Sequence, residues 1–393
     1  MADFIDVIRR MRKLSGEEEK AIESLDWCVN QKQKKILSGL IKEKKIAIEQ
    51  ESFSVGGLLE SVTLPKLVVK KETAETKALV EEIRAAIEER TKKTLFEEFS
   101  KTIHEKCSQI IAPNIVGFET VKKAVALQLF SPERIHILLL GDPGTGKTQI
   151  LSAATELAPI SSMGLGSGTS GVGLAVTMKG NEVMKGLLPM ANNGLCAIDE
   201  LNLMKEESRA SLYNAMEKGF VSYDKGGHSF KFDAKISVLA TANPKGDKFT
   251  GKTVNELKKQ LPFDAALLTR FHLTFLVKKH DIEEFKKITK ALLQKSKTEM
   301  TEKEKKFLKD YVQHAHSIGE ISIPKKFEQE IVDFIADIKE NEHKYLVEIS
   351  PRMVVGFTRL AKASARMELR KEVVEKDVKL VKQIVTESLK LAS

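Results

Sequence analysis

The chain has 393 residues, of which 42% are hydrophobic, so it is long and apolar enough for two or three domains with buried cores. Its three cysteines, Cys28, Cys107 and Cys196, lie far apart and form no Cys/His cluster, so the sequence suggests neither a disulfide framework nor a structural zinc site. The net charge of +9 fits an anionic partner such as nucleic acid, or simply a lysine-rich surface, and charge alone does not decide between them.

The first hundred residues contain no motif that carries chemistry. The N-terminus includes an acid, Asp3, and lacks an uninterrupted apolar core, and no apolar run approaches the ~20 residues of a membrane span. We therefore expect no signal peptide, no membrane contact and a cytoplasmic location. Residues 17–25 and 76–90 predict helices, and residues 61–70 predict an extended segment. Residues 1–104 are expected to form a small, mainly helical accessory domain and connector.

Three short apolar runs between residues 105 and 280 predict a parallel β-sheet. They span residues 135–140, 195–198 and 236–240, are bounded by turn residues, and are separated by helical stretches. Such runs are typical of an α/β fold whose sheet is covered by helices on both faces. Ligands in this class bind at the carboxyl ends of the strands, and all three runs end there in polar residues.

The first of these runs leads into a phosphate-binding loop. Residues 141–148 match GxxxxGK[ST] and open a predicted helix over 149–157, which is the context that the motif requires. The glycines let backbone N–H groups surround phosphates, Lys147 reaches the β- and γ-phosphates, and the Thr148 hydroxyl is a ligand for Mg²⁺. ATP and Mg²⁺ are therefore the expected cofactors. The expected nucleotide-binding residues are Gly141, Asp142, Pro143, Gly144, Thr145, Gly146, Lys147, Thr148 and Gln149.

The other two runs supply acids and an amide for hydrolysis. Asp199 and Glu200 follow the second run, where one carboxylate holds the Mg²⁺ shell and the next orients or deprotonates the attacking water. Asn243 ends the third run and can bind the γ-phosphate or that water, although an Asn before Pro244 also forms turns. Arg270 lies further along the chain and is a candidate arginine finger.

Residues 281–393 predict a helical lid domain. Ser350 and Pro351 are suited to the N-cap and the first position of a helix. The buried face of that helix is expected to contain Val354, Phe357 and Ala361. Asp377 is expected to open a last helix, whose apolar face consists of Val378, Val381, Val385 and Leu389.

The order of these motifs resembles one known family. Residues 111–117, 121–124 and 127–130 resemble the beginning of the AAA+ core of the minichromosome maintenance (MCM) replicative helicases. The phosphate-binding loop, residues 198–204, 240–244 and 267–271, and the arginines of residues 352–366 continue in the same order. The chain is similar to this family over residues 105–393, which implies an AAA+ P-loop core over 105–280 and a lid over 281–393.

The resemblance implies a DNA-dependent motor. The family forms hexameric rings with ATP sites between subunits, so the likeness implies a homo-oligomer in which Arg270 and Arg352 act on the nucleotide of a neighbour. It also implies single-stranded and double-stranded DNA as partners in replication, and a nucleoid-associated location in a prokaryote. The candidate catalytic residues are then Lys147, Asp199, Glu200, Asn243, Arg270 and Arg352, and the candidate metal ligands are Thr148 and Asp199.

Two insertions typical of the family are also expected. Residues 219–232 alternate like two strands around a tight turn and resemble the pre-sensor-1 hairpin, in which Lys225 matches the lysine that faces DNA. Residues 170–188 resemble the insert within the second core helix, where Lys179 and Lys185 are further candidates for DNA contact. The alternative for both insertions is an ordinary surface hairpin without a DNA contact.

The sequence departs from the family pattern in several places. The second-helix insert is a few residues shorter, and His272 follows Arg270 and Phe271 where the family usually has aspartate. The N-terminal region is shorter and lacks the zinc cysteines, and we expect no zinc and no winged-helix domain after Ser393. The chain thus resembles a short, divergent MCM homologue of archaeal type.

Two other classes of function stay open at this point. One is an AAA+ remodelling chaperone like the MoxR and magnesium-chelatase group, which acts on a protein complex. The other is a regulatory ring subunit that binds ATP and hardly hydrolyses it, although the complete set of Lys147, Asp199, Glu200 and Arg270 argues against this. Stimulation of ATP hydrolysis by single-stranded DNA separates the helicase from the chaperone.

Overall fold

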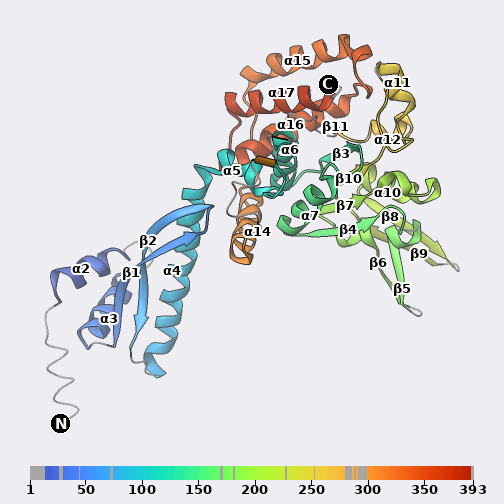
Figure 1. The fold of residues 1–393 in the computed structure, drawn as a ribbon. Coiled ribbons are helices and arrows are strands. Elements are labelled where there is room, and N and C mark those ends of the chain that lie inside the picture. The colour runs from blue at the N-terminus through green and yellow to red at the C-terminus, as the bar shows by residue number, and fades with distance from the viewer. Residues whose placement is uncertain are drawn as a thin grey trace. The chain divides into compact units, whose positions relative to one another are not determined.

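The computed structural model describes residues 14–25, 30–43, 45–70, 74–168, 171–179, 182–225, 228–251, 253–278, 286, 289–290 and 299–390. The chain divides into two compact units, Met1–Thr102 and Ile103–Ser393. The first unit combines helices with a β-hairpin, and the second contains the phosphate-binding loop (Figure 1). Among the described residues, no helix has both the length and the apolar character needed to cross a membrane.

The N-terminal unit packs helices against a two-stranded antiparallel sheet. Its elements are α2 (Gly16–Glu23), α3 (Gln31–Lys42), β1 (Ile46–Val55), β2 (Leu59–Val69) and α4 (Ala74–Ser100). The predicted helices and the extended segment are confirmed, whereas the partner strand β1 was not predicted. Capping boxes at Ser15 and Asn30 define the starts of α2 and α3. Leu25, Leu37 and Ile83 are buried in the core between these elements.

A five-stranded parallel sheet forms the centre of the second unit. Its strands are β3 (His136–Gly141), β4 (Ser161–Leu165), β7 (Leu195–Asp199), β10 (Ser237–Ala242) and β11 (Leu273–Val277). They are arranged in the order β11-β3-β10-β7-β4. The three predicted apolar runs are the three central strands, β3, β10 and β7, which confirms the α/β prediction.

Both faces of this sheet are buried. Leu138, Cys196 and Val238 share a core with Leu212 and Met216 of α10 (Glu206–Lys218). Alternate residues of a strand point to opposite faces, and the alternate set here is buried as well: Ile137, Leu139, Ala197 and Leu239. Helix α7 (Lys147–Leu157) packs against β4, β7 and β10, and Figure 1 shows α7 and α10 on opposite sides of the sheet. This double coverage explains why the central strands are continuous apolar runs.

Helices of the lid pack beside the sheet. They are α14 (Glu302–His316), α15 (Glu328–Glu340), α16 (Pro351–Met367) and α17 (Glu375–Leu389). Helices α16 and α17 contact each other and α6 (Glu119–Phe130), and α17 also contacts β11. The predicted apolar face of the last helix is confirmed, since Val378, Val381, Val385 and Leu389 are all buried. The helix begins at Glu375 rather than at Asp377, whose carboxylate accepts a hydrogen bond from the Val374 N–H.

The predicted start of α16 is confirmed, and one residue of its predicted buried face is wrong. Ser350 is the N-cap residue and Pro351 begins the helix, but the Ser350 side chain makes no capping hydrogen bond. Phe357 and Ala361 are buried as expected, whereas Val354 is 39% exposed. Val354 was assigned to the wrong face because the buried stripe follows the 3.6-residue period through Met353, Phe357 and Leu360.

Two β-hairpins extend from the core. Strands β8 (Phe220–Lys225) and β9 (His228–Asp233) pair antiparallel, which confirms the hairpin predicted over residues 219–232. Strands β5 (Val176–Lys179) and β6 (Glu182–Lys185) form the other hairpin, between α8 (Gly171–Ala175) and α9 (Leu187–Met190). Helices α8 and α9, which flank the β5–β6 hairpin, both pack against β8 of the other hairpin. The two hairpins therefore project from the same side of the core (Figure 1).

Candidate functional site

The phosphate-binding loop connects β3 to α7 at the carboxyl end of the sheet. A Cβ on Gly141 would lie 1.8 Å from the Val277 carbonyl oxygen, so only glycine fits where the loop leaves the strand. Gly146 precedes α7 with a φ of +84°, in the left-handed region that glycine favours. The Asp142 carboxylate anchors the loop by accepting a hydrogen bond of 3.0 Å from the Phe249 N–H. The loop therefore ends at a helix N-terminus, where anions bind favourably.

The Lys147 ammonium is buried and held by the backbone of the loop. Its Nζ donates hydrogen bonds of 2.8 Å to the Gly141 carbonyl and 2.6 Å to the Asp142 carbonyl. Burial lowers the pKa of Lys147 to about 8, although the carboxylates of Asp142, Asp199 and Glu200 oppose this shift. A bound polyphosphate would supply further negative charge and favour the protonated form.

Thr148 and Asp199 meet from the first turn of α7 and the end of β7. Thr148 Oγ1 donates to the Asp199 carboxylate, at 3.0 Å from Oδ2 and 3.3 Å from Oδ1. A hydroxyl and a carboxylate are the hard oxygen ligands that Mg²⁺ prefers, and Mg²⁺ usually keeps several waters. Two protein ligands therefore suffice, and this pair fits the expected ion.

Glu200 follows Asp199 in a left-handed backbone conformation, with φ 52° and ψ 46°. Its N–H donates a hydrogen bond of 2.9 Å to Thr241 Oγ1, and its carbonyl accepts one of 2.9 Å from Leu203. Thr241 in turn donates to Oδ1 of Asp199. The Thr241 hydroxyl thus holds both acids at the sheet edge, where a carboxylate can orient or deprotonate a water.

Asn243 lies just beyond β10, beside the segment that follows the two acids. Its backbone N–H donates a hydrogen bond of 2.9 Å to Oδ1 of Asn202, which lies in the 3₁₀ helix η1 (Leu201–Leu203). The structure therefore brings Asn243 together with Asp199 and Glu200. Neither Thr241 nor Asn202 was predicted from the sequence to belong to the site. The available signal for Thr241 was its position at the carboxyl end of a strand two residues before Asn243.

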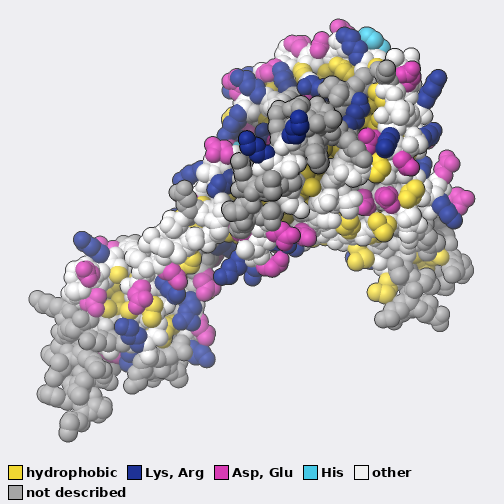
Figure 2. All heavy atoms as spheres, viewed as in Figure 1, with side chains coloured by type: hydrophobic (Ala, Val, Ile, Leu, Met, Phe, Trp, Pro, Cys, Tyr) yellow, Lys and Arg dark blue, Asp and Glu magenta, His cyan; other side chains and the backbone are white. Residues whose placement is uncertain are grey.

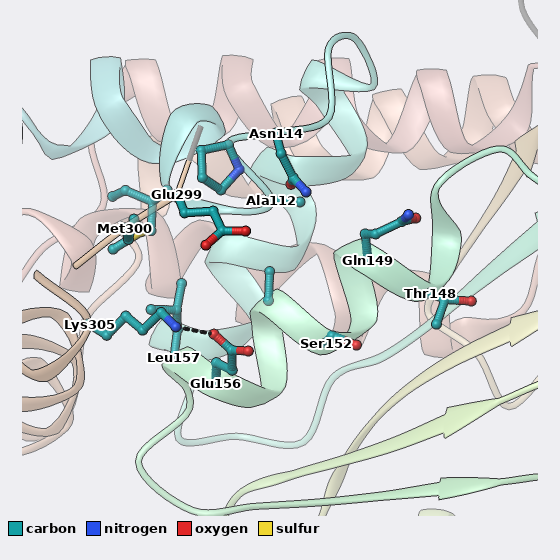
Figure 3. A pocket seen from close by; sticks show the side chains of 13 residues that line it. Ala112, Asn114, Thr148, Gln149, Ser152, Glu156, Leu157, Glu299, Met300 and Lys305 are labelled. Carbon is teal, nitrogen blue, oxygen red and sulfur yellow. Dashed lines mark ion pairs between the residues drawn. The ribbon is translucent and has the colours of Figure 1, made fainter. Parts of the chain in front are cut away.

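A cavity of about 340 Å³ lies beside α7 (Figure 3). Thr148 and Gln149 line it from α7, and Asn114 lines it from the segment before α6. Lys305 of α14 forms an ion pair of 2.8 Å with Glu156 at the end of the cavity remote from Thr148. Because Thr148 belongs both to this cavity and to the phosphate site, the cavity extends the phosphate site along α7. Its volume and its amide side chains suit a small organic ligand.

Arg270 and Arg352 converge on a different carboxylate, Glu217 at the end of α10. Arg270 follows α12 (Ala265–Leu268), and its Nη2 lies 3.2 Å from Glu217 Oε2. Arg352 lies in the first turn of α16, and its Nη2 lies 3.3 Å from Glu217 Oε1. The end of α10 is next to the amino end of β3, because His136 Nε2 lies 3.3 Å from the Met216 carbonyl oxygen.

That position is at the opposite edge of the sheet from the phosphate-binding loop. Strand β3 begins at His136 and ends at Gly141, and at 3.3 Å per residue these ends are roughly 16 Å apart. The loop leaves the carboxyl end of β3, while Glu217 and its two arginines lie near the amino end. The structure therefore does not bring Arg270 and Arg352 together with Lys147, Asp199 and Glu200 of the same chain.

His272 is buried between β3 and β11. Its backbone N–H donates a hydrogen bond of 2.8 Å to the His136 carbonyl, and its Nδ1 accepts one of 2.9 Å from the His136 N–H. Burial, together with the positive charges of the Arg359 and Arg352 guanidinium groups, lowers the pKa of His272 to about 3. The imidazole is thus a neutral acceptor within the sheet, and the carboxylate that pairs with Arg270 is Glu217.

The predicted DNA-binding lysines lie on the two hairpins. Lys185 ends β6 and is exposed. Lys179 ends β5 and Lys225 ends β8, but the side chains of both lie outside the described part of the chain.

Comparisons with known proteins identify a family to which the chain is similar. Residues 92–296 match the MCM P-loop domain, and residues 306–389 match the MCM AAA-lid domain. DNA replication licensing factor mcm7-B of Xenopus laevis is 32% identical over 352 residues, which cover 82% of this chain and 47% of that protein. DNA replication licensing factor mcm4 of Xenopus tropicalis is 31% identical over 73% of this chain and 36% of that protein. Minichromosome maintenance protein MCM of Saccharolobus solfataricus is 29% identical over 70% of this chain and 43% of that protein. The matches thus span less than half the length of these relatives.

Proposed function

Because this chain belongs to the minichromosome maintenance (MCM) family, we propose that it is a Mg-ATP-dependent DNA translocase and helicase of replication. The relatives named DNA replication licensing factors give the proposal its direction. The observation that carries its chemistry is the convergence of Lys147, Thr148 and Asp199 at the carboxyl end of a parallel sheet.

We assign the phosphates of ATP to the loop over residues 141–148, including Gly144 and Thr145, and the adenosine to the cavity beside α7. Thr148 and Asp199 would hold Mg²⁺, which neutralises phosphate charge when bound. Lys147 adds an ammonium beside the same phosphates. Gln149 and Asn114 offer amides to the base or ribose from the cavity wall.

Hydrolysis requires that a water be held in line with the γ-phosphate and lose a proton. Glu200 supplies the carboxylate for this water, and Asn243 supplies an amide to the water or to the γ-phosphate. Thr241 positions Asp199 and Glu200 through its hydroxyl and so fixes the position of the proposed metal ligand relative to the proposed base.

Arg270 and Arg352 complete the site of a neighbouring subunit in this proposal. They lie at the amino edge of the sheet and the phosphates at the carboxyl edge, so an assembly has to join the amino edge of one chain to the carboxyl edge of the next. Head-to-tail contacts of this kind close into a ring when the rotation between subunits permits it, and we propose a homohexamer. Arg270 then stabilises the charge that develops on the transferring phosphoryl group.

The contact with DNA is assigned to the hairpins. Lys225 at the tip of the β8–β9 hairpin, with contributions from Lys185 and Lys179, would bind DNA phosphates without regard to sequence. Over the core and lid in Figure 2, Lys and Arg side chains alternate with Asp and Glu, so the net charge of +9 does not by itself mark a DNA surface on that face. A prokaryotic cytoplasm and its nucleoid are the proposed location.

Neither zinc nor a protein substrate has a part in this proposal. The three cysteines are isolated in the sequence, and no zinc-binding role is assigned to them. A remodelling chaperone is not favoured, because the relatives are named for DNA replication or minichromosome maintenance.

The proposal is tested by ATP hydrolysis with and without single-stranded DNA over a range of salt concentrations. DNA should stimulate turnover at low salt, and log K for DNA should fall with log salt by roughly 0.7 per neutralised phosphate. Glu200→Gln serves as the control, since it should give little turnover in either condition and so exclude a contaminating ATPase. If single-stranded DNA does not stimulate ATP hydrolysis at any salt concentration, in protein that hydrolyses ATP, the helicase proposal is wrong.

A further inference from the structure

Glu217 is the side chain at which two distant parts of the chain meet. Arg270 comes from the segment before β11 and Arg352 from the first turn of the lid helix α16, and each pairs with one oxygen of the same carboxylate, at 3.2 Å and 3.3 Å. The two arginines are 53 and 135 residues from Glu217 in sequence. Glu217 belongs to none of the motifs in the sequence.

The surroundings of Glu217 restrain both guanidinium groups. The Arg270 guanidinium lies over the Tyr213 ring at 4.6 Å, and its Nη1 donates to the Ala266 carbonyl. The Arg352 Nη1 lies 3.4 Å from the Thr269 carbonyl oxygen. Two cations so close to one another repel, and the carboxylate between them offsets that repulsion.

We propose that Glu217 is a positioning residue that holds Arg270 and Arg352 together as one cationic unit for the phosphates of the adjacent subunit. This inference rests on the proposed function, because it assumes that both arginines act in trans. The pair retains a net positive charge after Glu217 is counted. It is also partly accessible, since the Arg352 side chain is 36% exposed and the Arg270 side chain 20%. An anion on a neighbouring chain can therefore reach the guanidinium groups without first breaking a buried ion pair.

The pairing also links the ATPase core to the lid. Arg270 belongs to the core and Arg352 to α16, so a carboxylate that binds both fixes the position of the lid helix relative to Arg270. Donors that are already aimed at developing charge stabilise a transition state more than donors that have to reorganise. Loss of Glu217 should thus slow the chemical step and leave ATP binding on the loop of the same chain intact.

The test compares Glu217→Ala, Glu217→Gln and Glu217→Asp with Glu207→Ala, an exposed glutamate on the same helix. Glu217→Ala should lower kcat by about tenfold to 100-fold, the cost of misplacing a catalytic group by about 1 Å, with KM for ATP changed less than about twofold. Asp should recover part of the loss because it keeps the charge, whereas Gln should recover little. Glu207→Ala should leave kcat unchanged.

Mixed assemblies separate this role from a purely structural one. Glu217→Ala subunits mixed with Lys147→Ala subunits should regain activity, because the second subunit supplies an intact Glu217, Arg270 and Arg352 to the loop of the first. Recovery for Arg270→Ala but not for Glu217→Ala would overturn the positioning role, and so would a kcat that rises or stays unchanged in Glu217→Ala. Failure of both mixtures, where mixed rings demonstrably form, would instead overturn the proposed action in trans.

Discussion

Thr241 determines the geometry of both acids of the candidate site. Its hydroxyl donates to Asp199 and accepts from the N–H of Glu200, so one side chain on β10 fixes the metal ligand and the turn that carries the water-activating carboxylate. The sequence alone could not rank Thr241 above other polar strand ends, because its partner Asp199 is 42 residues away. The motifs, in contrast, identified Lys147 and Thr148 within one loop and Asp199 and Glu200 as adjacent acids, because each of these two patterns is local in the sequence.

Substitution of Lys147 should affect ATP binding, whereas substitution of Glu200 should affect only the hydrolysis step. Lys147→Ala should abolish ATP binding or turnover, since the ammonium neutralises the phosphates directly. Glu200→Gln should keep ATP binding and lower kcat by about 10²-fold to 10⁴-fold, the usual contribution of a general base. ATP affinity and single-turnover rates for both variants check this, and a wild-type rate for Glu200→Gln would refute the water-activating role.

His272 should make the protein less stable as the solution becomes acidic. Its pKa is 6.5 in the unfolded chain and about 3 in the folded protein, so between these values the unfolded state binds more protons. The contribution of the neutral His272 to the free energy of unfolding is therefore complete above pH 6.5, and it is lost progressively as the pH falls toward about 3. Between pH 6.5 and about pH 5 the loss from this residue should be about 2 kcal/mol, at 1.36 kcal/mol per pH unit.

Urea unfolding at several pH values measures this effect in wild type and in His272→Asn. The variant should have a lower free energy of unfolding at neutral pH, because the packing between β3 and β11 changes. Its free energy of unfolding should depend less on pH between pH 6.5 and about pH 5. The neighbouring His136, whose pKa burial also lowers, should preserve part of the slope. Equal slopes in the two proteins would contradict the account of His272.

Among the strands, burial decided which ones could be predicted. β3, β7 and β10 are covered on both faces and are therefore continuous apolar runs. The edge strands β4 and β11 were missed, and in β4 the exposed Met163 and Leu165 alternate with a small or polar residue. β1 was missed for a similar reason, since much of it is polar, although its partner β2 was predicted as an extended segment.

In the lid, Asp377 should matter far more than the charged residues around it. Its carboxylate is fully buried, is paired with Arg370 at 2.8 Å and accepts from the Ser364 hydroxyl at 2.6 Å. Asp377→Ala leaves the partly buried Arg370 guanidinium with Glu368 as its one remaining carboxylate partner and removes the acceptor of the Ser364 hydroxyl, so it should lower the free energy of unfolding by about 3 to 5 kcal/mol.

Lys379→Ala on the same helix is the matched control. Its ion pair with Glu375 is exposed on both sides, so its removal should produce no measurable change. Urea unfolding midpoints of the two variants decide the question. Similar losses for both would mean that the network around Asp377 does not hold α17 in place.

For the assembled protein, the separation of the two sheet edges has a direct consequence. Arg270→Ala should lower kcat by about 10³-fold or more, as expected of an arginine finger, and still bind ATP. Mixing it with inactive Lys147→Ala subunits should restore activity, since some interfaces then pair an intact loop with an intact finger.

A second mixture gives the control for this experiment. Arg270→Ala mixed with Arg352→Ala should stay inactive, because both variants are deficient on the same side of the interface. Recovery in this control, or none in the first mixture when mixed rings demonstrably form, would count against action in trans.

The most direct test of a motor that couples ATP to DNA is the stimulation of ATP hydrolysis by single-stranded DNA in Lys225→Ala. Lys235→Ala is the matched control, because this exposed lysine lies just after the same hairpin. The proposed function predicts that Lys225→Ala loses most of the stimulation and shows a shallower salt dependence of DNA binding, while Lys235→Ala keeps both. Unchanged affinity, salt dependence and stimulation in Lys225→Ala would show that the hairpin does not transmit ATP hydrolysis to DNA.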